Sequence, residues 1–316
     1  MRRLLLNKFA GSFATFFFLA GVVPVAAETL TGSTVESRVL LGFKVNDDAI
    51  GDMLPEEWMT ETLPQGPVGG SNLIIALIDR HVILDADGQP ADTSSGPTVA
   101  FLAYGRNDSV EGVRGFVTLV YEEHPLVNPY SNSVAADINR IAGYIDAGGG
   151  ARTQSEIWTV KPEGGGDLSF DLDYKVGGFN WSTGSESRPY SAVNPDFFRI
   201  YRYDQLAGLA MNVAMGRELN GTASFSSTVP DLAKLFDGSE ELVAIVLSDL
   251  KRQADRVSDL LVRAPFQPGH SRRGHRRRRP RLGLAASPRP GDRGALGDHG
   301  ADPAGDQQRV DQLLVR

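Results

Sequence analysis

Apolar and polar residues alternate most regularly over residues 168–176. The apolar positions are Leu168, Phe170, Leu172, Tyr174 and Val176, and the polar positions between them are Ser169, Asp171, Asp173 and Lys175. Successive side chains of a strand point to opposite faces, so this pattern predicts an antiparallel strand with one buried face and one solvated face. Shorter apolar runs predict further strands at 73–78, 81–84, 98–104, 115–121, 155–160, 197–203, 208–215 and 222–227.

Helical spacing of apolar residues predicts three helices, over residues 45–54, 133–145 and 237–261. The third opens with a capping box formed by Asp237 and Glu240. Roughly eight to ten strands with few helices, and no regular strand-helix-strand alternation, argue against a parallel sheet. We therefore expect a mainly β (α+β) fold, a largely antiparallel barrel or sandwich with two or three peripheral helices.

The N-terminal segment has the pattern of an export signal. Arg2, Arg3 and Lys8 supply a basic start, residues 9–27 carry no charge, and small residues precede Glu28. We expect residues 1–27 to be a signal peptide and the mature protein to be periplasmic or extracellular, with no membrane attachment after cleavage. The alternative is an uncleaved anchor, because the apolar stretch approaches the roughly 20 residues that cross a bilayer.

Charge is distributed unevenly along the chain. It has 32 basic and 39 acidic residues in total, of which 14 basic and 5 acidic residues lie outside residues 28–263. The segment 28–263 therefore carries 18 bases against 34 acids, a formal charge of -16. Such a body repels nucleic acid and anionic lipid, so no nucleic-acid partner is expected. With no cysteine in the chain, this single acidic domain must be held together by its core.

The composition changes abruptly at residue 264. Residues 264–316 hold 11 Arg, no Lys, 8 Gly and 6 Pro, without apolar periodicity before Leu313. This segment cannot bury enough apolar surface to offset its chain entropy, which predicts disorder. Three interpretations remain: a shifted reading frame in a GC-rich gene, a genuine disordered tail, or a nucleic-acid-binding tail using the run Arg276 to Arg279.

Metal and cofactor chemistry has little support in the body. It contains two histidines, His81 and His124, so a zinc site with the usual two or three histidine ligands would need both of them. The acidic turn that starts at Asp85 has its glycine in the wrong place for a calcium loop. The glycine triplets are not followed by the Lys-Ser/Thr of a phosphate loop. We expect neither a metal nor an organic cofactor.

Proton transfer and amine chemistry leave a few candidates. His124 follows Glu122 and Glu123 at a predicted strand end. It is either a solvated loop histidine or a general acid/base assisted by one of those carboxylates. A desolvated lysine can form a Schiff base with a keto acid, and Lys161, which precedes Pro162, is the candidate for that role.

Three segments resemble the acetoacetate decarboxylase family: residues 45–57, 115–125 and the Gly-Arg-Glu-Leu stretch within 215–219. The resemblance implies a β-barrel or cone with a buried apolar cavity, in which a Schiff-base lysine decarboxylates a β-keto acid without metal or organic cofactor. In the family a lysine pair follows the Gly-Arg-Glu-Leu stretch. Here Ser224 and Phe225 stand in the corresponding places.

Three functions follow as hypotheses. The first is a non-catalytic β-barrel that binds a small apolar or keto-acid-like molecule, lined by Trp58, Phe116, Trp158 and Trp181. The second is a cofactor-free lyase acting through Lys161 or another displaced lysine, with Glu122 or Glu123 positioning the substrate. The third is a structural envelope protein without a ligand.

Overall fold

The computed structural model describes residues 27–91, 96–125, 127–146 and 152–258. The predicted signal peptide up to residue 26 and the tail 264–316 lie outside the described residues. Most of the described chain is strand, which confirms the mainly β prediction. The strands are β1 Ala27–Lys44, β2 Met59–Thr60, β3 Leu73–Leu84, β4 Gly96–Asn107, β5 Val110–Glu122, β6 Ser133–Asp146, β7 Arg152–Pro162, β8 Leu168–Val176, β9 Phe179–Ser187, β10 Tyr190–Ser191, β11 Arg199–Asn212, β12 Gly221–Ser227 and β13 Glu241–Ser258.

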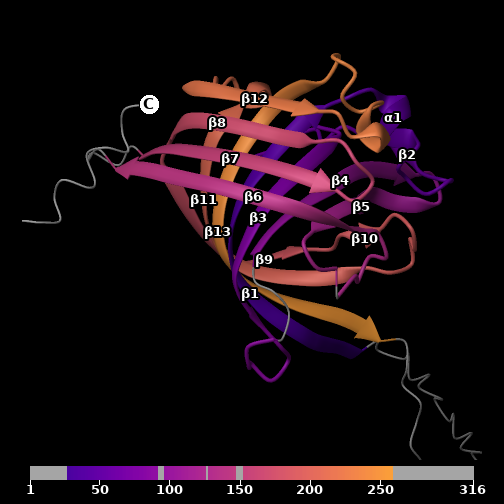
Figure 1. The fold of residues 1–316 in the computed structure, drawn as a ribbon. Coiled ribbons are helices and arrows are strands. Elements are labelled where there is room, and N and C mark those ends of the chain that lie inside the picture. Colours follow the sequence, from indigo (N-terminus) through magenta and orange to yellow (C-terminus); the bar gives the residue numbers. More distant parts are fainter. Residues whose placement is uncertain (1–26, 92–95, 126, 147–151, 259–316) are drawn as a thin grey trace, which may run out of the picture. The chain divides into compact units, whose positions relative to one another are not determined.

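The strands form one sheet in the order β12-β8-β7-β6-β5-β4-β3-β1-β13-β11-β9 (Figure 1), with β2 and β10 as side pairs. Neighbours along this order are antiparallel except β5 and β6. The described sheet has two ends, β12 and β9, and is not closed through a ladder. The chain joins the two end regions, because β8 leads into β9 through Gly177 and Gly178.

The main core lies on one face of this sheet. Strands β7 and β8 contribute Trp158, Phe170 and Tyr174 to the same buried cluster as Val39 of β1 and Ile75 of β3. Strand β8 has the predicted alternation, since its five apolar residues are buried while the residues between them are not. The cluster therefore packs the β6 to β8 part of the sheet against its β1 to β4 part.

The opposite face of β3, β4 and β5 is also covered. Smaller buried clusters there contain Ala76, Ala100 and Val117, together with Tyr130 and Tyr201. These strands are buried on both faces, which accounts for the unbroken apolar runs in their sequences. This second face carries the largest cavity described below.

The predicted helix over residues 133–145 is wrong, because this segment is strand β6. It pairs with β7 over most of its length, from Ala136 opposite Pro162 to Asp146 opposite Arg152. The helical stripe would bury Ile145, yet that side chain is 68 % exposed. Branched side chains, which favour strands, gave a helical spacing here by coincidence.

The predicted helix over residues 237–261 is also wrong, and strand β13 takes its place up to Ser258. This strand pairs with β1 on one side and β11 on the other. Its consecutive residues 243–248 are all buried, so its apolar run is covered on both faces. The expected capping box is a turn instead, in which Asp237 accepts the N–H of Ser239 and Glu240 accepts that of Gly238. Residues 259–261 lie outside the described chain.

The short helix predicted over residues 45–54 is confirmed as α1, Asp47–Gly51, capped by Asn46, whose side chain accepts the N–H of Asp48. The two strands predicted at 197–203 and 208–215 are one strand, β11, followed by the 3₁₀ turn η1, Val213–Met215. A second 3₁₀ turn, η2, covers Pro230–Leu232. No helix among the described residues is long and apolar enough to span a membrane.

Candidate functional site

A cavity of about 480 Å³ lies on the second face of the sheet. Its floor is apolar and its lining contains five arginines, so we name it the arginine cavity. The floor consists of Ala76, Ile78, Ala100, Leu102, Val117 and Val120, and the arginines are Arg38, Arg80, Arg188, Arg199 and Arg252. A mostly apolar cavity of this size with a few polar groups is the usual form of a small-molecule site.

Two of the arginines share one buried carboxylate. The Glu36 side chain is fully buried and forms ion pairs with Arg38 and, at 3.2 Å, with Arg252. Thr34 donates a further hydrogen bond to Glu36 Oε2 at 3.0 Å. Burial alone raises the pKa of Glu36, but the two guanidiniums outweigh it and hold that pKa below its ordinary value. Glu36 is therefore ionised and neutralises one of the two positive charges.

Tyrosines form another part of the wall. The Arg252 guanidinium lies 4.3 Å from the ring centroid of Tyr201, and the Tyr130 hydroxyl donates to the Tyr201 hydroxyl at 3.0 Å. Burial raises the pKa of Tyr130, and it raises the pKa of Tyr104 to about 12. Both phenols are neutral near pH 7, so they add hydrogen-bonding groups to the cavity without adding negative charge.

Arg80 and Arg199 are less well paired. Arg80 Nη2 is 3.5 Å from Glu122 Oε2, a long contact, and Arg80 Nε has no hydrogen-bond partner. Arg199 Nε is also buried without a partner, as is the hydroxyl of Thr98. Arg199 forms no ion pair with any described residue. Among the described residues, the five lining arginines are accompanied by Asp85 and Glu122 in the lining and by the ion-pair partners Glu36 and Glu186, which leaves an excess of one positive charge.

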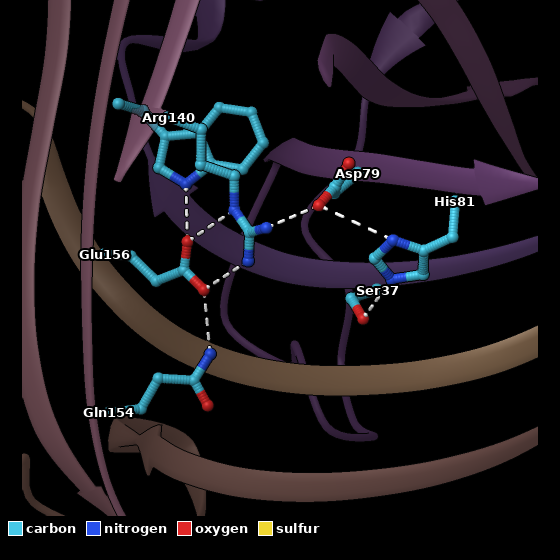
Figure 2. Close-up of polar contacts among 7 residues, drawn as sticks. Ser37, Asp79, His81, Arg140, Gln154 and Glu156 are labelled. Carbon is cyan, nitrogen blue, oxygen red and sulfur yellow. Dashed lines mark hydrogen bonds and ion pairs between the residues drawn. The ribbon is translucent and has the colours of Figure 1, made fainter. Parts of the chain in front are cut away.

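A second cavity, of about 420 Å³, opens on the main-core face, and we name it the inner cavity. Its lining includes Ser37, His81, Arg140, Glu156 and Trp158. Figure 2 shows the polar contacts at its wall, which connect β1 and β3 to β6 and β7. Unlike the arginine cavity, its lining is rich in groups that are already paired.

Arg140 and Glu156 are the centre of these contacts. The Glu156 side chain is fully buried and accepts hydrogen bonds from Arg140 Nε at 2.9 Å and Nη2 at 2.8 Å. Gln154 and Trp158 each donate one more, at 2.8 and 2.9 Å (Figure 2). Burial alone lowers the pKa of Arg140, but Glu156 and Asp79 outweigh it and raise that pKa above its ordinary value. This buried carboxylate is therefore fully satisfied.

The predicted acid/base residues separate in the structure. Glu122 and His124 both line the arginine cavity, whereas Glu123 is exposed and is not part of its lining. Lys161 lies outside both cavities, with its side chain 65 % exposed and its Nζ 4.0 Å from Asp167. Two of these four residues, Glu122 and His124, thus line the arginine cavity, and Lys161 is not among its lining residues.

The predicted aromatic lining does not converge on one cavity. Trp58 and Phe116 pack edge to face, with ring centroids 4.7 Å apart, outside both cavities. Trp158 lines the inner cavity, and Trp181 is 60 % exposed on β9. Aromatic content alone did not indicate where the hollow spaces lie.

The lysines of the described chain also lie away from both cavities. Lys44 binds Asp47 at 2.8 Å, Lys234 binds Asp52 at 2.5 Å, and Lys175 and Lys251 are exposed. Within the described residues, no group of three or more His, Asp or Glu side chains is arranged to hold a metal ion.

Neither a protein-family model nor a curated protein matches the sequence. Solved structures do match. An acetoacetate decarboxylase-like enzyme from Sphingomonas wittichii RW1 is 13% identical with a TM-score of 0.45, covering 79% of this chain and 99% of that one. The enduracididine biosynthesis enzyme MppR, complexed with pyruvate, is 11% identical with a TM-score of 0.42, covering 72% and 88%.

The likeness to both structures is one of overall fold alone, at TM-scores of 0.45 and 0.42. Identities of 11% and 13% carry no information about the reaction or the ligand, because one fold hosts many functions.

Sequence reasoning missed the arginines of the cavity. Arg199 lies within strand β11 and has apolar neighbours on both sides, Phe198 and Ile200. A charged residue inside an apolar strand is unusual unless it is paired or faces a polar space. That pattern was the available indication.

Proposed function

We propose that this protein binds a small molecule with an apolar body and a carboxylate head group in the arginine cavity, without chemical conversion. A keto acid, a fatty acid and an aromatic acid all have this form. The apolar body would contact the floor around Ala100 and Val117. The carboxylate would receive hydrogen bonds from the wall.

The observation that carries the proposal is the buried, unpartnered guanidinium N–H of Arg199 next to an apolar floor. A buried N–H donor that has no acceptor costs about 1–3 kcal/mol. Arg80 and Thr98 add two more unpartnered polar atoms to the same wall. A bound carboxylate would accept from such donors and would neutralise excess positive charge.

The lyase alternative has less support. A Schiff base requires an amine next to the bound carbonyl, and the described lysines lie outside both cavities. Lys161, the sequence-based candidate, is largely exposed and close to Asp167. The binding function needs no amine, which is why we favour it.

Export is part of the proposal and rests on the sequence of residues 1–27. The formal charge of -16 over residues 28–263 favours the solubility of such an exported carrier. The third hypothesis, a structural protein without a ligand, does not account for unpartnered guanidinium groups in a cavity of about 480 Å³.

Displacement of anilinonaphthalene sulfonate, an apolar anionic dye, tests the proposal. The full chain is saturated with dye and titrated separately with β-keto acids, fatty acids and aromatic acids. We expect at least one class to displace the dye in the micromolar range. Failure of all three classes contradicts the proposal. Borohydride added to an acetoacetate sample is expected to leave the protein mass unchanged, and a lysine adduct would favour the lyase.

A further inference from the structure

Ser37 and His81 line the inner cavity, and Asp79 lies on the far side of the His81 imidazole. Ser37 Oγ is 2.9 Å from His81 Nε2, and His81 Nδ1 is 3.7 Å from Asp79 Oδ2 (Figure 2). With the His81 proton on Nδ1, the imidazole faces the carboxylate on one side and accepts the Ser37 hydroxyl on the other. A hydroxyl, a base and an orienting carboxylate in this order are the parts of an activated nucleophile.

The strand pairing explains why these three residues meet. Ser37 of β1 is directly opposite Asp79 of β3. The register then passes from Arg80 opposite Glu36 to Val82 opposite Val35, which leaves His81 as an extra residue without a partner. Such a bulge redirects a side chain and is frequent beside active sites. Here it brings the imidazole over Ser37.

The carboxylate of Asp79 is itself held in place. Arg140 Nη1 donates to Asp79 Oδ2 at 2.5 Å, while the rest of that guanidinium is fixed by the buried Glu156. The histidine therefore faces a carboxylate whose position is set from a different part of the sheet, the β6 to β7 pair. Support of this kind is what keeps a catalytic group in a productive orientation.

We propose that Ser37 is a nucleophile that cleaves small acyl esters in the inner cavity, with His81 as its general base. Ser37 Oγ forms a bond to the acyl carbon as its proton passes to His81 Nε2. The bond to the alcohol oxygen then breaks, and that oxygen takes the proton from His81. Water, deprotonated by His81, attacks the acyl carbon of the acyl-serine. The bond from that carbon to Ser37 Oγ breaks, Oγ takes the proton back from His81, and the carboxylic acid leaves. One ester and one water give one acid and one alcohol.

The cavity around this serine suits a small substrate. The space of about 420 Å³ also has the guanidinium of Arg152 in its lining, whereas Arg140 is committed to Glu156 and Asp79. A positive group in the lining favours the oxyanion that forms during attack. The aromatic rings of Trp158 and Phe179 line the same space and supply apolar contact for a short acyl or alcohol group.

A fluorophosphonate probe tests the proposal on the full chain, with peptide mapping by mass spectrometry. We expect a single adduct on the peptide containing Ser37, together with hydrolysis of p-nitrophenyl acetate above the buffer rate. Ser37→Ala abolishes both. His81→Gln lowers the labelling rate by about 100-fold or more, because general-base catalysis contributes that much. Ser155→Ala, at an exposed serine of β7, is the matched control and leaves both unchanged.

Three results would overturn the assignment: no adduct, an adduct on another residue, or labelling that His81→Gln does not slow. Decanoate binding separates this proposal from the ligand-binding function. Ser37→Ala is expected to keep binding, and Arg199→Ala, in the other cavity, is expected to keep labelling. Ester hydrolysis that persists in Ser37→Ala counts against the nucleophile even where the acid still binds.

Discussion

At the scale of single residues, the charge of the arginine cavity depends on which carboxylates pair with its guanidiniums. Glu36 forms ion pairs with both Arg38 and Arg252. The contact between Glu122 and Arg80 is long, at 3.5 Å. Removing one partner of a buried ion pair costs about 3–5 kcal/mol, because the other charge is left uncompensated. Glu36 is therefore a residue on which both the stability and the charge of the cavity depend.

Glu36→Gln is expected to destabilise the protein at pH 7 by about 3–5 kcal/mol. The native pKa of Glu36 is below its ordinary value of 4.5, so its contribution is complete above pH 4.5 and is lost as the pH falls through the native pKa. The stability difference between wild type and variant should narrow on acidification below pH 4.5. Urea unfolding at several pH values measures this. A difference that stays constant contradicts it, and exposed Glu123→Gln should change stability by less than about 0.5 kcal/mol.

Sequence reasoning identified part of the site and could not identify the rest. Glu122 and His124 stood out as titratable groups at a strand end, and both line the arginine cavity. Arg199 and Arg252 did not, because their meeting depends on the pairing of β11 with β13, which joins residues far apart in sequence. Ser37 and His81 were missed for a similar reason, since a bulge in a long-range ladder brings them together.

At the scale of elements, the same apolar spacing was compatible with helix and strand. Residues 133–145 show apolar side chains at helical intervals, but β6 has an antiparallel partner in β7 over most of its length. In β13, burial on both faces removes the alternation that identifies a strand. Length misled as well, because 18-residue strands such as β1 and β13 are far longer than most.

Two alanine substitutions distinguish the strand from the helix at β6. Ile138 is 5 % exposed and Ile145 is 68 % exposed, whereas a helical stripe would bury both. We expect Ile138→Ala to lower the free energy of unfolding by about 2–5 kcal/mol and Ile145→Ala by less than about 0.5 kcal/mol. Chemical denaturation of both variants measures this. Similar large losses for the pair would favour the helix.

At the scale of the whole described body, one sheet separates two chemically different spaces. The main-core face holds the inner cavity, with its satisfied Arg140 and Glu156 network, and the second face holds the arginine cavity. The mainly β, largely antiparallel architecture was predictable from short apolar runs and from β8. The covering of both faces of the sheet was not predictable, because the sequence does not show which apolar runs are buried on both faces.

The central claim is that the positive wall of the arginine cavity selects a carboxylate. Isothermal titration of the full chain with decanoate and with decan-1-ol, which differ only in the head group, tests it most directly. A hydrogen bond to a charged group contributes about 1.5–3 kcal/mol, so decanoate should bind about 10-fold to 100-fold more tightly. Arg199→Ala should lose this preference, and Arg106→Ala, an exposed arginine paired with Glu61 outside the cavity, should keep it. Equal affinity for acid and alcohol in the wild type, or a preference that survives in Arg199→Ala, would contradict the account.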